Sequence, residues 1–183
     1  MQTPWGKADS IKNIAPGIKF VSTPSHGGFK LDRRNNARMP LCFRKAGGWY
    51  EEDCEWAMVA VVFEAHFKEH LEQAKCTIKN YWPDKWEAFS GEKLKLKDSC
   101  VLRELEFERV HADDYVAVSA VGDWHKDVPK GKVGVCATKG GKRDFGAMKS
   151  SVEFFLVDSK DYDLREQFGY VVKPTDQLWE GQF

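Results

Sequence analysis

The segment YVAVSAV, residues 115–121, decides the fold class because two more strand-like segments follow it with no helix-forming stretch between them. β-Branched and aromatic residues favour the pleated surface of a strand, and residues 133–138 and 152–157 have the same character. Pro129 and two Gly-Lys pairs supply the connecting turns. The pattern predicts an antiparallel sheet in the C-terminal half of the chain, with residues 168–172 as a short fourth strand.

The middle of the chain has the helical period instead. Apolar residues recur at i, i+3, i+4 and i+7 from Trp56 to Phe63, and a similar spacing continues towards residue 81. Pro83 ends that helix and opens a short one, which Gly91 stops. We expect helices at about 52–66, 67–81, 84–89 and 100–109.

Residues 17–32, GIKFVSTPSHGGFKLD, form a candidate hairpin near the N-terminus, because apolar residues alternate on both sides of the stretch Pro24–Gly28. The sequence has no internal repeat and no long Gly/Ser/Pro-rich linker. It therefore predicts an α+β fold in one domain over residues 1–183. In that fold the middle helices pack against the mainly antiparallel C-terminal sheet, and the N-terminal hairpin is added to it.

Charge is balanced in total, with 28 Lys and Arg against 28 Asp and Glu, but it is distributed in blocks. Residues 1–50 carry a net +7 and residues 51–125 a net −8, whereas residues 126–149 carry +5 and residues 150–183 carry −4. Two faces of opposite sign are therefore possible, and either one could attract a charged partner.

The composition also indicates the compartment. Hydrophobic residues make up 42% of the chain, but no apolar run approaches the ~20 residues of a bilayer crossing, so no membrane partner is expected. The first residues lack the basic and apolar regions of a signal peptide. Five widely spaced cysteines without a CxxC pair argue against a disulfide framework. We expect a cytoplasmic protein with reduced thiols.

Ser25, His26, Gly27 and Gly28 form the first candidate site. Paired glycines let a backbone approach a ligand closely, and an exposed histidine can titrate near neutral pH. An ordinary turn with a surface histidine explains the same residues.

The segment WYEEDCEW, residues 49–56, is the second candidate. Four carboxylates, those of Glu51, Glu52, Asp53 and Glu55, lie at an expected helix start. The aromatic residues Trp49, Tyr50 and Trp56 flank them, and Cys54 lies among them. Acids in a first helical turn are stabilised by the helix dipole, and Asp53 is placed to cap the helix. Alternatively, the carboxylates bind a cation or a basic partner, or act in acid/base chemistry.

Asp123, Trp124 and His125 follow an expected strand and form the third candidate. Strand ends present functional groups, and Asp-x-His is a short-range arrangement that orients an imidazole. A polar turn next to a buried tryptophan is an equally good interpretation.

Lys139, Lys142 and Arg143 surround a Gly-Gly pair in the +5 block and form the fourth candidate. The spacing is not that of a phosphate-binding P-loop. A basic turn of this kind could still bind phosphates or an acidic protein surface, so direct nucleic-acid binding through the basic blocks stays open.

No metal or cofactor is predicted. His66 and His70 match the H-x-x-E-H pattern of some zinc peptidases, but they lie among exposed-looking charges and lack an evident third ligand.

Four blocks carry a resemblance to a known family: TPWG at residues 3–6, VSTPSHGGFKL at 21–31, WYEEDCEW at 49–56 and GDWHKDVPKG at 122–131. They are similar to an uncharacterised bacterial family, filed as a domain of unknown function, whose members occur largely on phages, plasmids and integrated mobile elements. The resemblance implies a small protein that acts on host defence or on host nucleic-acid machinery.

Two hypotheses follow. The first is a non-enzymatic binding protein of a mobile element that inhibits a host defence nuclease complex, such as CRISPR-Cas or a restriction system. The charge blocks and the seven tryptophans, which are frequent interface anchors, favour it. The alternative is a small hydrolase or group transferase, possibly metal-assisted, that gathers His26, the Glu51–Asp53 cluster and Asp123 with His125 in one pocket.

Overall fold

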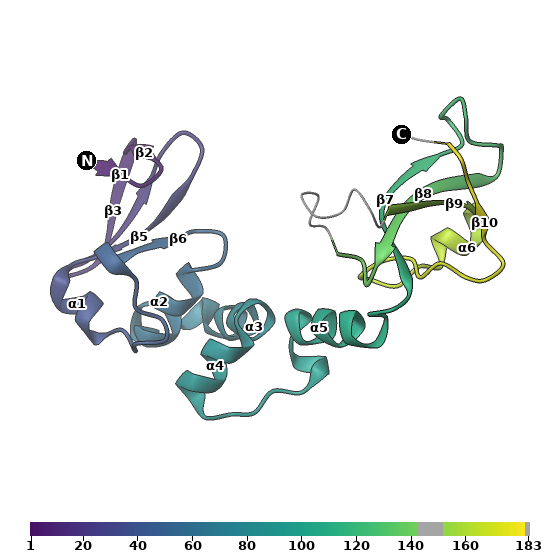
Figure 1. Ribbon diagram of the computed structural model, residues 1–183. Helices are drawn as coiled ribbons and strands as arrows, with labels where there is room; N and C mark the ends of the chain where they lie inside the picture. The colour runs from purple at the N-terminus through teal and green to yellow at the C-terminus, as the bar shows by residue number, and fades with distance from the viewer. Residues whose placement is uncertain (143–151, 182–183) are drawn as a thin grey trace. The chain divides into compact units, whose positions relative to one another are not determined.

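A four-stranded antiparallel sheet organises the first of two units into which contacts divide the chain, Met1–Leu102 and Arg103–Phe183 (Figure 1). The computed structural model describes residues 1–142 and 152–181. The single domain over residues 1–183 stays a prediction. The strand order is β3-β4-β5-β6, with β3 Ser10–Ala15, β4 Ile18–Ser22, β5 Gly27–Leu31 and β6 Trp49–Glu51.

The predicted hairpin is present as β4 and β5, in a register that pairs Phe20 with Phe29 and Val21 with Gly28. A separate two-stranded ribbon precedes the sheet, formed by β1 Gln2–Thr3 and β2 Gly6–Lys7. The turn of this ribbon contains Trp5. The ribbon, β3 and β6 were not expected from the sequence pattern.

Four helices complete the first unit: α1 Arg33–Arg38, α2 Trp56–Val62, α3 Leu71–Tyr81 and α4 Pro83–Ser90. Three short 3-10 turns lie between them, η1 Ala46–Gly48, η2 Glu64–His66 and η3 Lys68–His70, and a fourth follows α4, η4 Leu96–Asp98. Figure 1 shows α1 and α2 next to the strands of the sheet.

Helix α2 lies in the hydrophobic core of the first unit. Its residues Ala57–Val61 are all buried, which explains why a sequence rich in valine forms a helix here: an all-apolar helix is stable when every side is covered. Strand residues such as Ile18 and Leu31 bury in the same cluster as Ala74 and Ile78 of α3. The middle helices therefore share their core with the N-terminal strands, which form a full sheet rather than only a hairpin.

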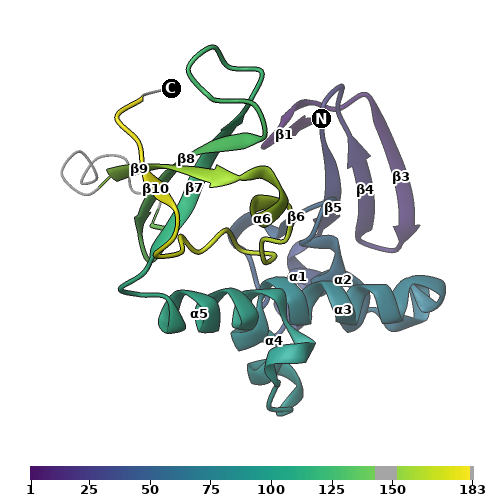
Figure 2. The same ribbon diagram turned by 90° about the vertical axis from the view of Figure 1, so that its right-hand side faces the viewer.

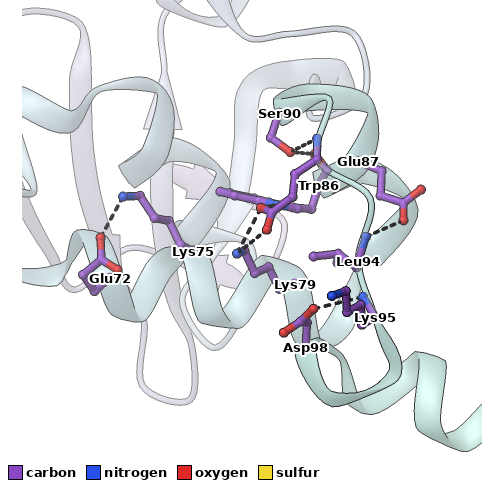
Figure 3. Close-up of polar contacts among 10 residues, drawn as sticks. Glu72, Lys75, Lys79, Trp86, Glu87, Ser90, Leu94, Lys95 and Asp98 are labelled. Carbon is purple, nitrogen blue, oxygen red and sulfur yellow. Dashed lines mark hydrogen bonds and ion pairs between the residues drawn. The ribbon is translucent and has the colours of Figure 1, made fainter.

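Helix α4 begins and ends where the sequence predicts. Pro83 occupies the first turn, where its missing N–H costs nothing, and Gly91 closes the helix with a left-handed φ of 74°. A polar network joins α4 to α3, as Figure 3 shows. The ammonium of Lys79 lies 3.1 Å from a Glu92 oxygen and 5.0 Å from the centre of the Trp86 ring, and the indole N–H of Trp86 donates to Glu92 at 2.9 Å.

The second unit is built on an antiparallel sheet of order β10-β9-β8-β7 (Figure 2). Its strands are β7 Tyr115–Gly122, β8 Lys132–Lys139, β9 Val152–Asp158 and β10 Gln177–Leu178, and helix α6 Ser159–Asp163 lies against β8 and β9. Helix α5, Cys100–Val110, contains the boundary between the units. These elements confirm the α+β class and the predicted C-terminal sheet.

The predicted fourth strand at residues 168–172 is wrong. This segment makes only isolated bridges, including Val116 with Val171, and the fourth strand is β10. Two backbone hydrogen bonds, from Ala117 N–H to Tyr170 and from Val172 N–H to Tyr115, hold the segment beside β7. Pro174 follows two residues later, and a proline cannot continue a hydrogen-bonded ladder.

Within the described residues, no helix is long and apolar enough to cross a membrane.

Removing the Tyr50 hydroxyl will destabilise the first unit. Tyr50 is fully buried, donates to Asn36 Oδ1 at 2.8 Å and accepts from the Lys45 backbone N–H at 3.2 Å. Tyr50→Phe leaves both partners without this hydroxyl, and we expect a loss of about 1–3 kcal/mol in the free energy of unfolding. Denaturant unfolding of the full chain measures it. Tyr81→Phe, at a 55%-exposed ring, is the control and should change little, and equal stability of the two variants contradicts the assignment.

Candidate functional site

Three tryptophans line an open groove of about 550 Å³ in the first unit: Trp5 from the ribbon, Trp49 from β6 and Trp82 from the α3–α4 junction. All three side chains are half-buried. The Trp5 and Trp49 rings meet edge to face, with centroids 5.6 Å apart and planes at 83°. The remaining lining residues are Pro4, Lys45, Ala46, Glu51, Cys54 and Glu55.

The glycine pair of the first candidate site makes room for two side chains of other blocks. A Cβ at Gly28 would lie 2.3 Å from the Trp5 ring and 2.4 Å from the Tyr50 carbonyl oxygen. A Cβ at Gly27 would lie 2.4 Å from a Glu52 carboxylate oxygen. The glycines are therefore needed for side-chain packing against β5, and they bring the predicted blocks at residues 3–6, 21–31 and 49–56 together.

Ser25 and His26 are exposed in the turn before this pair. Thr23 closes the turn, since its backbone N–H and its hydroxyl both donate to the His26 carbonyl oxygen, at 2.7 and 2.8 Å. The Glu52 N–H donates to the Gly27 carbonyl oxygen at 3.1 Å, so the turn lies beside the start of the acidic cluster. The structure thus brings together the first two candidate sites.

Two carboxylates hold the turn between β6 and α2. Glu51 accepts from the backbone N–H groups of Asp53 at 2.8 Å and Cys54 at 3.3 Å. Glu55 accepts from the Glu51 N–H at 3.0 Å and forms an ion pair with Lys45. The expected capping role of Asp53 is wrong, because α2 has Glu55 at its N-cap without a side-chain cap and Asp53 is exposed.

Cys54 faces the groove beside these carboxylates. Burial raises the pKa of its thiol, and the charges of Glu51, Asp53 and Glu55 raise it further. A thiolate is the nucleophilic form of cysteine, so this environment opposes nucleophilic chemistry at neutral pH. Tyr50, a predicted binding residue, is in the core, where burial raises the pKa of its phenol.

The third candidate occupies the loop between β7 and β8 in the second unit. Asp123 accepts from the Gly131 N–H at 3.0 Å, and His125 Nδ1 accepts from the Asp127 N–H at 3.4 Å. Val128 is buried in a small core and holds the loop to the sheet. Trp124 is 78% exposed, so the alternative interpretation, a polar turn next to a buried tryptophan, is wrong about this side chain. Convergence of this loop with His26 and the acidic cluster stays a prediction.

The fourth candidate lies at the end of β8. Lys139 and Lys142 are both exposed, and the Lys139 ammonium lies 6.0 Å from the centre of the Tyr115 ring. Gly140 and Gly141 have φ values of 66° and 65°, which fit the predicted turn. Arg143 lies outside the described residues.

Much of the acidic block is paired locally. Contacts between oppositely charged groups within residues 51–125 join Glu72 to Lys75, Glu92 to Lys79, Glu87 to Lys93 and Glu106 to Arg109. In the basic block, Arg44 donates to the Met39 and Ala37 carbonyl oxygens at the end of α1. Each of these pairs within residues 51–125 joins one anion and one cation of the same block, so the pairs leave its net charge of −8 unchanged.

Among the described residues, no group of three or more His, Cys, Asp and Glu side chains is arranged to hold a metal ion. His66 and His70 lie in two separate 3-10 turns, and the His70 ring contacts Trp56 edge to face.

Sequence reasoning missed Lys45 and Trp82 as groove residues and gave no site role to Trp5. For Trp5 the sequence offered one indication, since this residue belongs to the TPWG block of the family resemblance. For Trp82 the sequence offered only the neighbouring Pro83, which predicts a helix start but does not indicate which surface the indole faces.

Comparison with known proteins places the first unit in a family. The model of a domain of unknown function (DUF7007) matches residues 1–112, and the chain belongs to this family. The match contains the blocks at residues 3–6, 21–31 and 49–56 and ends before the block at 122–131. No curated protein and no solved structure matches the chain.

Alanine at Gly28 should destabilise the first unit more than alanine at Gly27 does. In Gly28→Ala the new methyl group meets the rigid Trp5 ring and a backbone carbonyl, and we expect a loss of about 1–3 kcal/mol in the free energy of unfolding. In Gly27→Ala it meets the end of the flexible Glu52 side chain and the Phe20 ring at 3.0 Å, so the loss should be smaller. Denaturant unfolding of both variants measures the order, and a larger loss in Gly27→Ala contradicts it.

The two thiols Cys54 and Cys76 will differ in reactivity. Cys76 is exposed, whereas the raised pKa and partial burial of Cys54 lower its thiolate fraction and its access to reagents. We expect iodoacetamide at about pH 8 to modify Cys54 several-fold more slowly, as followed by mass spectrometry of peptides. The difference should become smaller in denaturant, because burial is lost while the charges of the sequence neighbours Asp53 and Glu55 still oppose the thiolate. Faster modification of Cys54 in the folded protein would show that the groove activates the thiol.

Proposed function

We propose that the chain is a non-enzymatic binding protein that acts by stoichiometric association with a protein partner, and that this partner is a host defence nuclease complex such as CRISPR-Cas or a restriction system. The observation that carries the binding role is the groove of Trp5, Trp49 and Trp82. Tryptophan is among the residues that contribute most to binding energy at protein interfaces. Three indoles kept half-buried on a concave surface leave apolar area that a partner can remove from water.

The state of the carboxylates supports a binder over an enzyme. Glu51 and Glu55 accept hydrogen bonds from the backbone of their own turn, and Asp123 does the same in its loop. General acid and base groups need a proton exchange with substrate, which such fixed acceptor roles do not favour. Cys54 has a raised pKa, opposite to the change that activates a nucleophile.

The choice of a defence complex as partner rests on the resemblance of the sequence blocks to proteins of phages and plasmids. The exposed Trp124, in the loop before β8, and the basic residues Lys139 and Lys142, at the opposite end of β8, offer further contacts to a large complex. Charged groups at the rim of such a contact would make association dependent on salt.

Inhibition is expected to be stoichiometric. Purified full-length chain is titrated into defence nuclease complexes, and cleavage of a DNA target is measured at several salt concentrations. We expect the inhibition to be complete near one chain per complex and to weaken with salt. A pull-down with immobilised chain from host lysate tests for the partner directly.

Two outcomes contradict the proposal. Complete inhibition at far below one chain per complex indicates turnover and favours the enzyme hypothesis. No inhibition of any complex at molar excess, together with no recovered protein partner, removes the binding role.

A further inference from the structure

We propose that the tryptophan groove binds an extended peptide segment that presents an arginine side chain, with the guanidinium seated between the indoles and the carboxylates of Glu51 and Glu55. This inference rests on the proposed function and specifies the chemistry of the partner at the groove.

The indole surfaces favour a cation. Cations of the chain itself already lie on two of the tryptophans: the Lys30 ammonium is 5.0 Å from the centre of the Trp49 ring and the Lys85 ammonium is 5.5 Å from that of Trp82. Tryptophan is the strongest of the side chains that attract a cation through the ring face. Trp5, which makes its ring contact with Trp49, adds a third indole to the groove.

The charges of the lining have the complementary sign. Two carboxylates and one ammonium line the groove, and the ammonium of Lys45 is paired with Glu55. The two oxygens of Glu51 each accept one backbone N–H, and a carboxylate has about four acceptor positions in all, so Glu51 keeps capacity for a donor. Burial is the main cause of the raised pKa of Cys54, and the charges of Glu51, Asp53 and Glu55 raise it further.

Arginine fits this combination better than lysine does. A guanidinium is planar, stacks on aromatic rings and offers a fork of donors that matches a carboxylate, whereas an ammonium is a compact and strongly hydrated charge. Among the lining residues, an anionic ligand such as a phosphate would meet two carboxylates and the paired Lys45. The Lys30 and Lys85 ammonium groups lie on the rings of Trp49 and Trp82 and do not line the groove. The occupant that the groove favours is therefore a peptide with arginine.

Nuclear magnetic resonance titration of the full chain tests this inference without the natural partner. Three acetylated and amidated peptides of glycine and serine carry arginine, lysine or glutamine at one central position. We expect the arginine peptide to shift the indole N–H signals of Trp5, Trp49 and Trp82, assigned by single Trp→Phe variants. The lysine peptide should bind more weakly, and the glutamine peptide should give no shift.

Two variants and a matched control locate the interaction. Glu51→Gln removes a groove charge but keeps an acceptor, and Trp82→Leu removes one indole but keeps an apolar side chain. We expect each to weaken the arginine peptide by about fivefold or more. Glu69→Gln removes an exposed charge outside the groove and should leave the affinity unchanged. The dispersion of the remaining signals reports whether each variant is folded.

The inference is overturned by equal shifts with all three peptides, by no shift of the groove indoles up to millimolar peptide, or by unchanged affinity in folded Glu51→Gln and Trp82→Leu. A single-stranded oligonucleotide that shifts the same indoles more than the arginine peptide also overturns it. These results are separate from the inhibition assay, so a binder of a different chemistry would fail here and still inhibit its complex.

Discussion

The contact between the Trp5 ring and Gly28 is the constraint on which the first unit depends. Because Gly28 has no Cβ, the indole can lie against β5 near the start of the strand, and the same ring then meets Trp49 on the neighbouring strand. One contact thereby holds the N-terminal ribbon, β5 and β6 together and forms one side of the groove. Val21, paired with Gly28 in the sheet, is fully buried, so the contact also belongs to the packing of the sheet.

The turn between β6 and α2 combines structural and electrostatic roles. Glu51 and Glu55 satisfy backbone donors before an apolar helix that has no side-chain cap, and they also place negative charge at the edge of the indoles. A charge that is needed to fold the turn is fixed in position before any partner arrives. Such preorganisation reduces the ordering that binding would otherwise require.

The local sequence pattern predicted the elements that have clear periodicity or clear turn and cap residues. The hairpin around Pro24–Gly28 and the helix bounded by Pro83 and Gly91 are present, because turn and cap chemistry acts over a few residues. The segment at 168–172 looked like a strand but pairs only through isolated bridges, since register with a partner strand is a property of the tertiary fold. For the same reason the groove was not predictable: Trp5, Trp49 and Trp82 are distant in sequence, and only the packed sheet and helices bring them to one surface.

The edge-to-face arrangement of Trp5 and Trp49 has an optical consequence. Two indoles at a centroid separation of 5.6 Å have coupled excited states, and this coupling gives a pair its own circular dichroism in the far ultraviolet. Because Trp5 belongs to the ribbon and Trp49 to the sheet, the coupled signal exists only while the ribbon lies on the sheet. The protein therefore carries an intrinsic spectroscopic reporter of whether its N-terminal residues are docked.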